Sequence, residues 1–230
     1  ISQNDIDINE KSFDSFNSLF GFEYEITPLQ FAFKRENKEI VQLILSHKNI
    51  DVNARSIEKY EGRWTINGHQ MIYGPLHYAI RFVDINTIKM LMSNKNIDVN
   101  AQCIEIDGVF DSRETKNAIH LAIEKENVEI VKLLLSRQDI DVNCKCICFD
   151  RRNDYDVKSA LYKAVECCNI EIVKLLLENE RINVNDFYIR TEDKKKITQK
   201  KTALHMAAIW RNEEIIKLLL QHKNIDINVL

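Results

Sequence analysis

A four-residue motif recurs at nearly even spacing along the chain. Ile-Asp-Val-Asn, or a close variant, begins at Ile6, Ile50, Ile97, Ile140, Ile182 and Ile225. Successive starts are separated by 42 to 47 residues. A period of this size is typical of chains that stack one small structural unit upon the next, because a single unit cannot bury its own apolar face. We therefore expect a repeat array rather than one globular core.

Each of the last five motifs follows an apolar stretch with the period of an amphipathic helix. These stretches read EIVQLILS, TIKMLMSN, EIVKLLLS, EIVKLLLE and EIIKLLLQ. A short side chain that can accept hydrogen bonds from free helix amides precedes each stretch, which predicts the N-caps Asn37, Asp84, Asn127, Asn169 and Asn212. The stretches therefore predict the second helix of each repeat.

A first helix is expected further upstream in each repeat. The corresponding segments read TPLQFAF, GPLHYAI, NAIHLAI, SALYKAV and TALHMAA. Pro28 and Pro75 stand at the first helical position, where a missing amide proton costs nothing. One position is alanine in every repeat, which allows neighbouring helices to approach closely: Ala32, Ala79, Ala122, Ala164 and Ala207.

The order TPLHxA, EIVxLLL and DVN resembles the ankyrin repeat, and it occurs five times. The resemblance implies an all-α solenoid of five helix–turn–helix pairs joined by extended β-hairpin fingers. We expect a single domain over 1–230, cropped from a longer array. Its segments would be a repeat tail at 1–9, five repeats at 10–53, 54–100, 101–143, 144–185 and 186–228, and a fragment end at 229–230.

The chain departs from the family in the length of its repeats, which ordinarily span about 33 residues. The excess lies in five enlarged fingers at 10–26, 54–73, 101–116, 144–158 and 186–201. An apolar residue follows each tail Asn at the same distance, which predicts extended strands stacked side by side with a shared packed face: Phe13, Ile57, Ile104, Ile147 and Ile189. The usual Gly after the second helix is absent, so we expect Asn49, Asn96 and Asn224 to adopt the left-handed conformation there.

Composition narrows the classes of function. The formal net charge of −3 gives no general electrostatic reason to expect a nucleic acid, and no apolar run approaches the roughly 18 residues of a membrane span. The six cysteines lie between positions 103 and 168 without the even spacing of a disulfide framework. We therefore expect an intracellular, cytoplasmic protein that neither binds nucleic acid nor inserts into a membrane.

Three groups of residues could suggest chemistry. His77, His120 and His205 recur at one repeat position, and the resemblance implies that this His bonds to nearby backbone and to the motif Thr. The cysteines Cys103, Cys144, Cys146 and Cys148 could bind zinc, but they lack paired Cys-x-x-Cys knuckles, and cysteine is also a small apolar filler. The lysine-rich run 194–201 could touch an acidic partner or be a solvated hairpin tip. Without a catalytic motif, we predict no enzyme activity, no cofactor and no metal site.

The resemblance implies a scaffold, expected to be monomeric, that binds another protein along its concave face and finger tips. In the family, the positions that follow the motif Ala are exposed on the concave face. The residues at these positions are the candidates for binding a partner: Arg35, Arg81, Phe82, Lys125, Ile209 and Trp210. Trp64 is a further candidate, near the turn of a finger. Aromatic and Arg side chains are favoured because they supply most binding hot spots. Two alternatives remain open, a structural spacer in a longer protein and a metal-dependent role of the cysteines. Trp210 could also pack against a further repeat.

Overall fold

The computed structural model describes residues 7–16, 22–60, 68–82, 84–192 and 196–229. The chain divides into two compact units, Ile1–Asp111 and Ser112–Leu230, and each is described by itself. The expectation of a single domain over 1–230 stays a prediction. None of the helices in the described ranges is long and apolar enough to cross a membrane.

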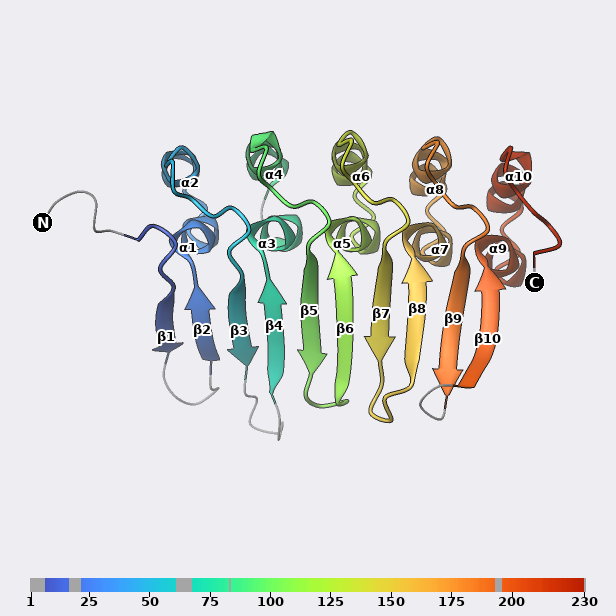
Figure 1. Ribbon diagram of the computed structural model, residues 1–230, viewed down its shortest axis with the longest axis horizontal. Coiled ribbons are helices and arrows are strands. Elements are labelled where there is room, and N and C mark those ends of the chain that lie inside the picture. The colour runs from blue at the N-terminus through green and yellow to red at the C-terminus, as the bar shows by residue number, and fades with distance from the viewer. Residues whose placement is uncertain (1–6, 17–21, 61–67, 83, 193–195, 230) are drawn as a thin grey trace, which may run out of the picture. The chain divides into compact units, whose positions relative to one another are not determined.

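The first unit contains five strands and two helix pairs (Figure 1). Its antiparallel sheet has the order β1-β2-β3-β4-β5. The strands are β1 (Ser12–Phe16), β2 (Phe22–Ile26), β3 (Ser56–Tyr60), β4 (His69–Tyr73) and β5 (Gln102–Asp107). The helices are α1 (Pro28–Lys34), α2 (Lys38–Leu45), α3 (Pro75–Phe82) and α4 (Ile85–Ser93).

The second unit repeats this plan with five strands and three helix pairs. The strands are β6 (Ser112–Asn117), β7 (Lys145–Phe149), β8 (Tyr155–Ser159), β9 (Phe187–Glu192) and β10 (Lys196–Thr202), and they pair in this order. The helices are α5 (Ala118–Glu124), α6 (Val128–Leu135), α7 (Ala160–Glu166), α8 (Ile170–Leu177), α9 (Ala203–Ile209) and α10 (Glu213–Gln221). In both units, the first helix of each pair lies between the sheet and the second helix (Figure 1).

The helix pairs and hairpin fingers are confirmed, but the description all-α is too narrow. Strands of one finger also pair with strands of the next, as β2 does with β3 and β8 with β9, so each unit has a continuous sheet. The long fingers make this possible, because each supplies strands of five to seven residues. The backbone N–H and C=O groups along the outer edges of these strands pair with those of the neighbouring finger.

The apolar finger residues do share one face of the sheet. In the first unit Phe13, Glu25, Ile57, Ile72 and Ile104 lie opposite one another in register. The corresponding row in the second unit is Thr115, Ile147, Val157, Ile189 and Lys200. We call this the outer sheet face. The expected packing is only partial, because the isoleucines are half-buried and Phe13 is 68% exposed.

The alanine and N-cap signals of the helices are confirmed. The five motif alanines are at most 4% exposed, as close helix approach requires. Each predicted N-cap accepts a backbone amide of its helix, as Asn127 does from Ile130 at 3.0 Å and Asn212 from Ile215 at 3.1 Å. A lost cap of this kind costs about 1 kcal/mol.

The predicted left-handed residues are wrong. Asn49, Asn96 and Asn224 have no positive φ, and their amides are instead bound by side chains, as Asn96 N–H is by Asn94 Oδ1 at 2.9 Å. These local hydrogen bonds close the turn without a left-handed residue. The left-handed conformation occurs between the first and second helices, at Glu36, Glu126, Cys168 and Arg211, with φ of 53°, 51°, 55° and 54°.

Candidate binding surface

The sheet face that turns toward the first helices is here called the inner sheet face. It carries Glu58 and Glu105 in the first unit, on the side opposite the isoleucine row. The Lys34 ammonium lies 3.8 Å from Glu58 and 3.6 Å from the centre of the Tyr24 ring. Arg81 forms an ion pair with Glu105. Helix and strand are therefore joined by charge across this face.

The second unit has a longer chain of ion pairs at the same place. Lys116 of β6 lies 2.9 Å from Glu124 of α5, which lies 3.1 Å from Lys163 of α7. Lys163 continues to Glu166 at 3.5 Å, and Glu166 to Lys158 of β8 at 2.8 Å. Partial burial makes such pairs stronger than surface ion pairs. The network holds the first helices against the sheet.

The ion pairs of this network shift the pKa values of the groups that form it. Burial opposes the charge on Lys116, but its ion pairs with Glu114 and Glu124 raise the pKa of Lys116 above its usual range. Burial alone would raise the pKa of Glu124. The positive charges of Lys116 and Lys163 have the larger effect, so the pKa of Glu124 is lowered. The sequence interpretation missed these groups. A Lys placed eight residues before a Glu, at 116 and 124 and again at 158 and 166, is the signal that could have found them.

The candidates of the first unit lie at the end of α3 and beside α1. Arg35 is exposed and stands over the Phe31 ring at 5.2 Å. Phe82 is 53% exposed and packs one side of its ring against Tyr78, with 4.9 Å between ring centres. Arg81 is half-buried because of its ion pair with Glu105. Trp64 lies outside the described residues.

The candidates of the second unit are exposed at the ends of α5 and α9. Lys125 is exposed at the C-cap of α5. Ile209 is 55% exposed and the adjacent Trp210 is 57% exposed. A neighbouring pair of large apolar side chains in water is the kind of surface at which protein partners bind.

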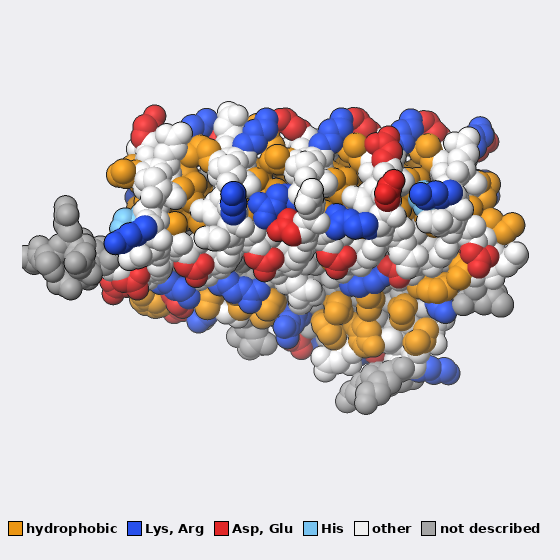
Figure 2. Space-filling model, turned by 45° about the horizontal axis from the view of Figure 1, so that its top comes forward, with side chains coloured by type: hydrophobic (Ala, Val, Ile, Leu, Met, Phe, Trp, Pro, Cys, Tyr) orange, Lys and Arg blue, Asp and Glu red, His pale blue; other side chains and the backbone are white. Residues whose placement is uncertain are grey.

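The structure has a second apolar surface, whose partial exposure the sequence interpretation did not predict. Figure 2 shows hydrophobic side chains gathered on the strands of the second unit. The half-buried apolar residues of the outer sheet face there are Ile147, Phe149, Tyr155, Val157, Phe187 and Ile189. Phe149 and Tyr155 contact with ring centres 5.5 Å apart. We call these six residues the outer apolar patch.

The lysine run lies beside this patch. Lys194 and Lys195 fall outside the described residues, whereas Lys196, Lys200 and Lys201 belong to β10. The Lys200 ammonium stands 3.8 Å from the centre of the Phe187 ring, a cation–π contact. The run therefore combines positive charge with an aromatic neighbour.

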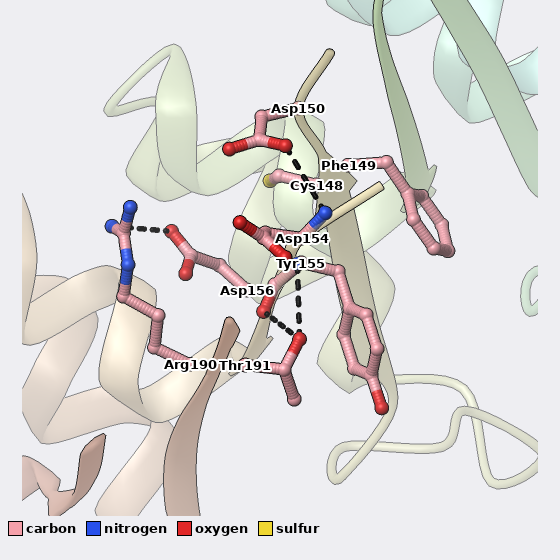
Figure 3. A pocket seen from close by; sticks show the side chains of 8 residues that line it. All are labelled: Cys148, Phe149, Asp150, Asp154, Tyr155, Asp156, Arg190 and Thr191. Carbon is pink, nitrogen blue, oxygen red and sulfur yellow. Dashed lines mark hydrogen bonds and ion pairs between the residues drawn. The ribbon is translucent and has the colours of Figure 1, made fainter. Parts of the chain in front are cut away.

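A cavity of about 110 Å³ lies at the tip of the β7–β8 hairpin, with β9 on one side (Figure 3). Its wall includes Cys148, Asp150, Asp154 and Asp156. Asp150 accepts from the Asp154 amide at 3.1 Å, and Asp156 lies 3.8 Å from the guanidinium of Arg190. The first contact closes the hairpin tip, and the second joins β8 to β9.

The recurring histidines are mainly structural, as the sequence indicated. His77 Nε2 lies 2.9 Å from the Ala101 carbonyl, and His205 Nδ1 lies 2.8 Å from the Thr202 hydroxyl. His120 differs, since its Nδ1 faces the Cys144 sulfur at 3.9 Å. His77 thus holds the backbone that follows it, and His205 holds the N-cap of its own helix.

Comparison with known proteins agrees with this architecture. A family model described as ankyrin repeats in three copies matches residues 6–103, 75–146, 104–188 and 145–230. A search of the curated proteins found no match. The fold is similar to the crystal structure of the ankyrin repeat domain of Bcl-3, a unique member of the IkappaB protein family. The TM-score is 0.58 at 18% identity, over 89% of this chain and 74% of that one, and so low an identity supports the fold alone.

Proposed function

Because the chain belongs to the ankyrin-repeat family, we propose that it is a non-enzymatic scaffold that binds another protein. Ankyrin repeats are generally protein–protein interaction modules. The proposed surface in each unit consists of the ends of the first helices, the inner sheet face and the finger tips. The observation that carries the proposal is the exposed Ile209–Trp210 pair, with Phe82 as its counterpart in the first unit.

The physical basis of affinity is a surface that is ordered before a partner arrives. Ion pairs such as Lys116–Glu124 and Lys158–Glu166 fix helix against strand. A preordered surface loses little conformational entropy on binding, so more of the contact free energy appears as affinity. Arg35, Arg81 and Lys125 add charge around the aromatic residues, and Trp64 is proposed with them on a finger tip.

The alternative is a structural spacer within a longer protein. A spacer requires only that the repeats stack, and it gives no reason to keep large apolar side chains in water. Phe82, Ile209 and Trp210 are each more than half exposed, which favours a binding role. We infer a monomeric protein of the cell interior. The second inference is supported by the cysteines, which form no disulfide among the described residues, as expected in a reducing compartment.

The test is affinity capture from a lysate of the cells that make the protein. The native chain is compared with a Trp64→Ala, Phe82→Ala, Trp210→Ala triple variant. A Leu43→Ala, Leu220→Ala variant is the matched control, because these leucines are 72% and 48% exposed on second helices. Circular dichroism checks that all variants are folded.

We expect the triple variant to lose proteins that the native chain and the leucine control both retain. Recovery of the same proteins in equal amounts by all three would contradict the proposed surface. A Phe149→Ala, Phe187→Ala variant is the further arm, since it trims the outer apolar patch. Loss of partners in that variant alone would move the binding surface to the outer sheet face.

A further inference from the structure

Three side chains with metal-binding atoms converge on the inner sheet face of the second unit. Cys146 and Cys148 are two apart on β7, so both point to this face, and Glu114 of β6 lies opposite Cys148 in register. The two sulfur atoms and a carboxylate oxygen all lie within 4.8 Å of one another. Among the described residues, this is the one group of three or more His, Cys, Asp or Glu side chains whose ligand atoms lie close enough to share one ion.

The group is already linked by hydrogen bonds. Cys148 donates its S–H proton to Glu114 Oε1 at 3.0 Å. The other carboxylate oxygen lies 2.8 Å from the Lys116 ammonium. His120 completes the surroundings, since its Nδ1 faces the Cys144 sulfur at 3.9 Å and its Nε2 is buried without a hydrogen-bond partner among the described residues. The side chains are therefore oriented before any ion arrives.

We propose that Cys146, Cys148 and Glu114 bind one Zn²⁺ ion. Zinc binds thiolate at about 2.3 Å and carboxylate oxygen at about 2.0–2.2 Å in tetrahedral geometry, which places two bound sulfur atoms ~3.8 Å apart. Ligand atoms that already lie within 4.8 Å need to move by only about 1 Å or less to reach this geometry. A mixed sulfur and oxygen donor set also selects a borderline ion over Mg²⁺ or Ca²⁺.

The electrostatics of the group favour a cation. The two thiolates and the Glu114 carboxylate would place three negative charges within 4.8 Å of one another, and a bound cation offsets their repulsion. Zinc binds the deprotonated sulfur atoms, so the S–H protons of Cys146 and Cys148 leave for solvent as the two Zn–S bonds form. The remaining negative charge faces Lys116, and Lys163 acts on Cys146 from α7.

The ion has an entry path and a fourth coordination position. Cys148 also lines the cavity at the β7–β8 tip, so water can reach its sulfur from that side. A water molecule there is the fourth ligand. His120 is a positioning residue, because it lies near Cys146 and its buried Nε2 can donate a hydrogen bond to the sulfur when the ion is bound.

A catalytic role for the Cys146–His120 pair is a weaker explanation. A cysteine with a histidine nearby is the pair of residue types used in nucleophilic catalysis, and His120 lies near Cys146. The sulfur nevertheless belongs to a side chain that is 1% exposed, so a substrate has no access to it. A small ion requires far less room than a substrate.

The experiment titrates Zn²⁺ into the chelator-stripped, reduced chain in competition with a chromophoric chelator. Co²⁺ is used in parallel, because thiolate-to-cobalt charge-transfer bands report sulfur ligation directly. We expect one equivalent of Zn²⁺ per chain and thiolate bands with Co²⁺. Cys148→Ser and Glu114→Gln should each weaken Zn²⁺ binding more than about tenfold, since even outer-shell changes cost about 10–100-fold.

The matched control is Cys168→Ser, which removes an exposed thiol outside the group and should leave Zn²⁺ affinity unchanged. Circular dichroism of the stripped variants separates lost ligation from lost folding. Binding of less than a tenth of an equivalent would overturn the proposal. Equal affinity of the native chain and folded Cys148→Ser would do the same.

Discussion

The side-chain amide of Asn143 donates a hydrogen bond to the backbone carbonyl of Arg181 at 2.8 Å. Its Oδ1 accepts from the amide of Asn183, also at 2.8 Å. Asn185 makes the same two contacts with Asn224 and Asp226. The last residue of one repeat motif therefore fastens the backbone of the next, which gives the recurring Asn of the sequence a physical reason.

Replacing Asn143 should loosen one junction between repeats. Asn143→Ala removes both hydrogen bonds, and we expect a loss of about 1–3 kcal/mol in the free energy of unfolding. Urea unfolding followed by circular dichroism measures it. Gln138→Ala is the control, because only the backbone carbonyl of that exposed residue contacts Arg181. An Asn143→Ala midpoint equal to that of the control would show that the contact adds no stability.

Gly74 leaves a gap that a hydroxyl group should fill. Thr27 and Thr202 are the N-caps of α1 and α9, and Thr202 Oγ1 lies 2.8 Å from His205 Nδ1. Gly74 offers no such group, and the buried Nδ1 of His77 has no hydrogen-bond partner among the described residues. A Cβ built at Gly74 would lie 3.6 Å from that nitrogen, which is ordinary contact.

Gly74→Thr should therefore stabilise the protein. It supplies an N-cap for α3, which adds a few tenths of a kcal/mol over Gly. It also supplies a hydrogen-bond partner for the buried His77, so we expect a total gain of about 1 kcal/mol. Gly74→Ala is the control, since it shares the reduced freedom of the unfolded chain but lacks the hydroxyl. Thermal and urea unfolding compare the two. If Gly74→Thr is no more stable than Gly74→Ala, the missing hydroxyl is not what this position lacks.

Local patterns explain which parts of the fold could be predicted. The caps, helices and finger strands follow from residues close together in sequence, such as Asn127 before its apolar run. The left-handed residues could not be found in this way, because Glu126, Cys168 and Arg211 are not residue types that favour that conformation. The packing of two helices imposes it on them.

In the candidate sites, too, features that depend on repeat position could be predicted, whereas contacts between distant segments could not. Exposure of Phe82 and Trp210 follows from repeat position, whereas the pairing of Arg81 with Glu105 depends on how a later finger is placed. Glu114 and Cys148 are 34 residues apart and meet only through the register of β6 against β7. Cysteine spacing alone suggested four sulfur atoms, and it could not indicate that a carboxylate stands beside two of them.

The stability of the protein should fall in mildly acidic solution because of His77. Burial lowers the pKa of His77 to about 4, although its hydrogen bond with Ala101 opposes the shift. The unfolded residue has a pKa of about 6.5, so between pH 6.5 and 4 only the unfolded chain binds the proton. Stability therefore decreases as pH falls through this window, by ~3 kcal/mol at most from this residue.

His77→Gln is the variant that isolates this effect. Glutamine is compatible with the position, since Gln30 occupies it in an earlier repeat and donates to the Tyr73 carbonyl at 3.2 Å. We expect urea midpoints of the native chain to fall more steeply between pH 6.5 and 4 than those of His77→Gln. Parallel curves for the two proteins would mean that His77 does not remain neutral in the folded state.

Arg211 offers a test of backbone strain. Its φ of 54° places a non-glycine residue in the left-handed region, and its side chain is exposed at the turn between α9 and α10. The left-handed conformation costs an L-residue about 1–2 kcal/mol. Glycine removes that cost, but it increases the freedom of the unfolded chain by about 0.4–1 kcal/mol. Because the relief of strain exceeds this entropic cost, Arg211→Gly should stabilise the protein by about 0.5–1 kcal/mol.

The matched change is Arg211→Ala, which removes the same charged side chain but keeps the Cβ that causes the strain. We expect Arg211→Ala to be no more stable than the native chain and Arg211→Gly to unfold at higher urea concentration than both. The hydrogen bond from the Arg211 amide to the Ala208 carbonyl, 3.1 Å long, is available to all three proteins, so it does not affect the comparison. Equal midpoints for the Gly and Ala variants would show that the turn carries no strain for glycine to relieve.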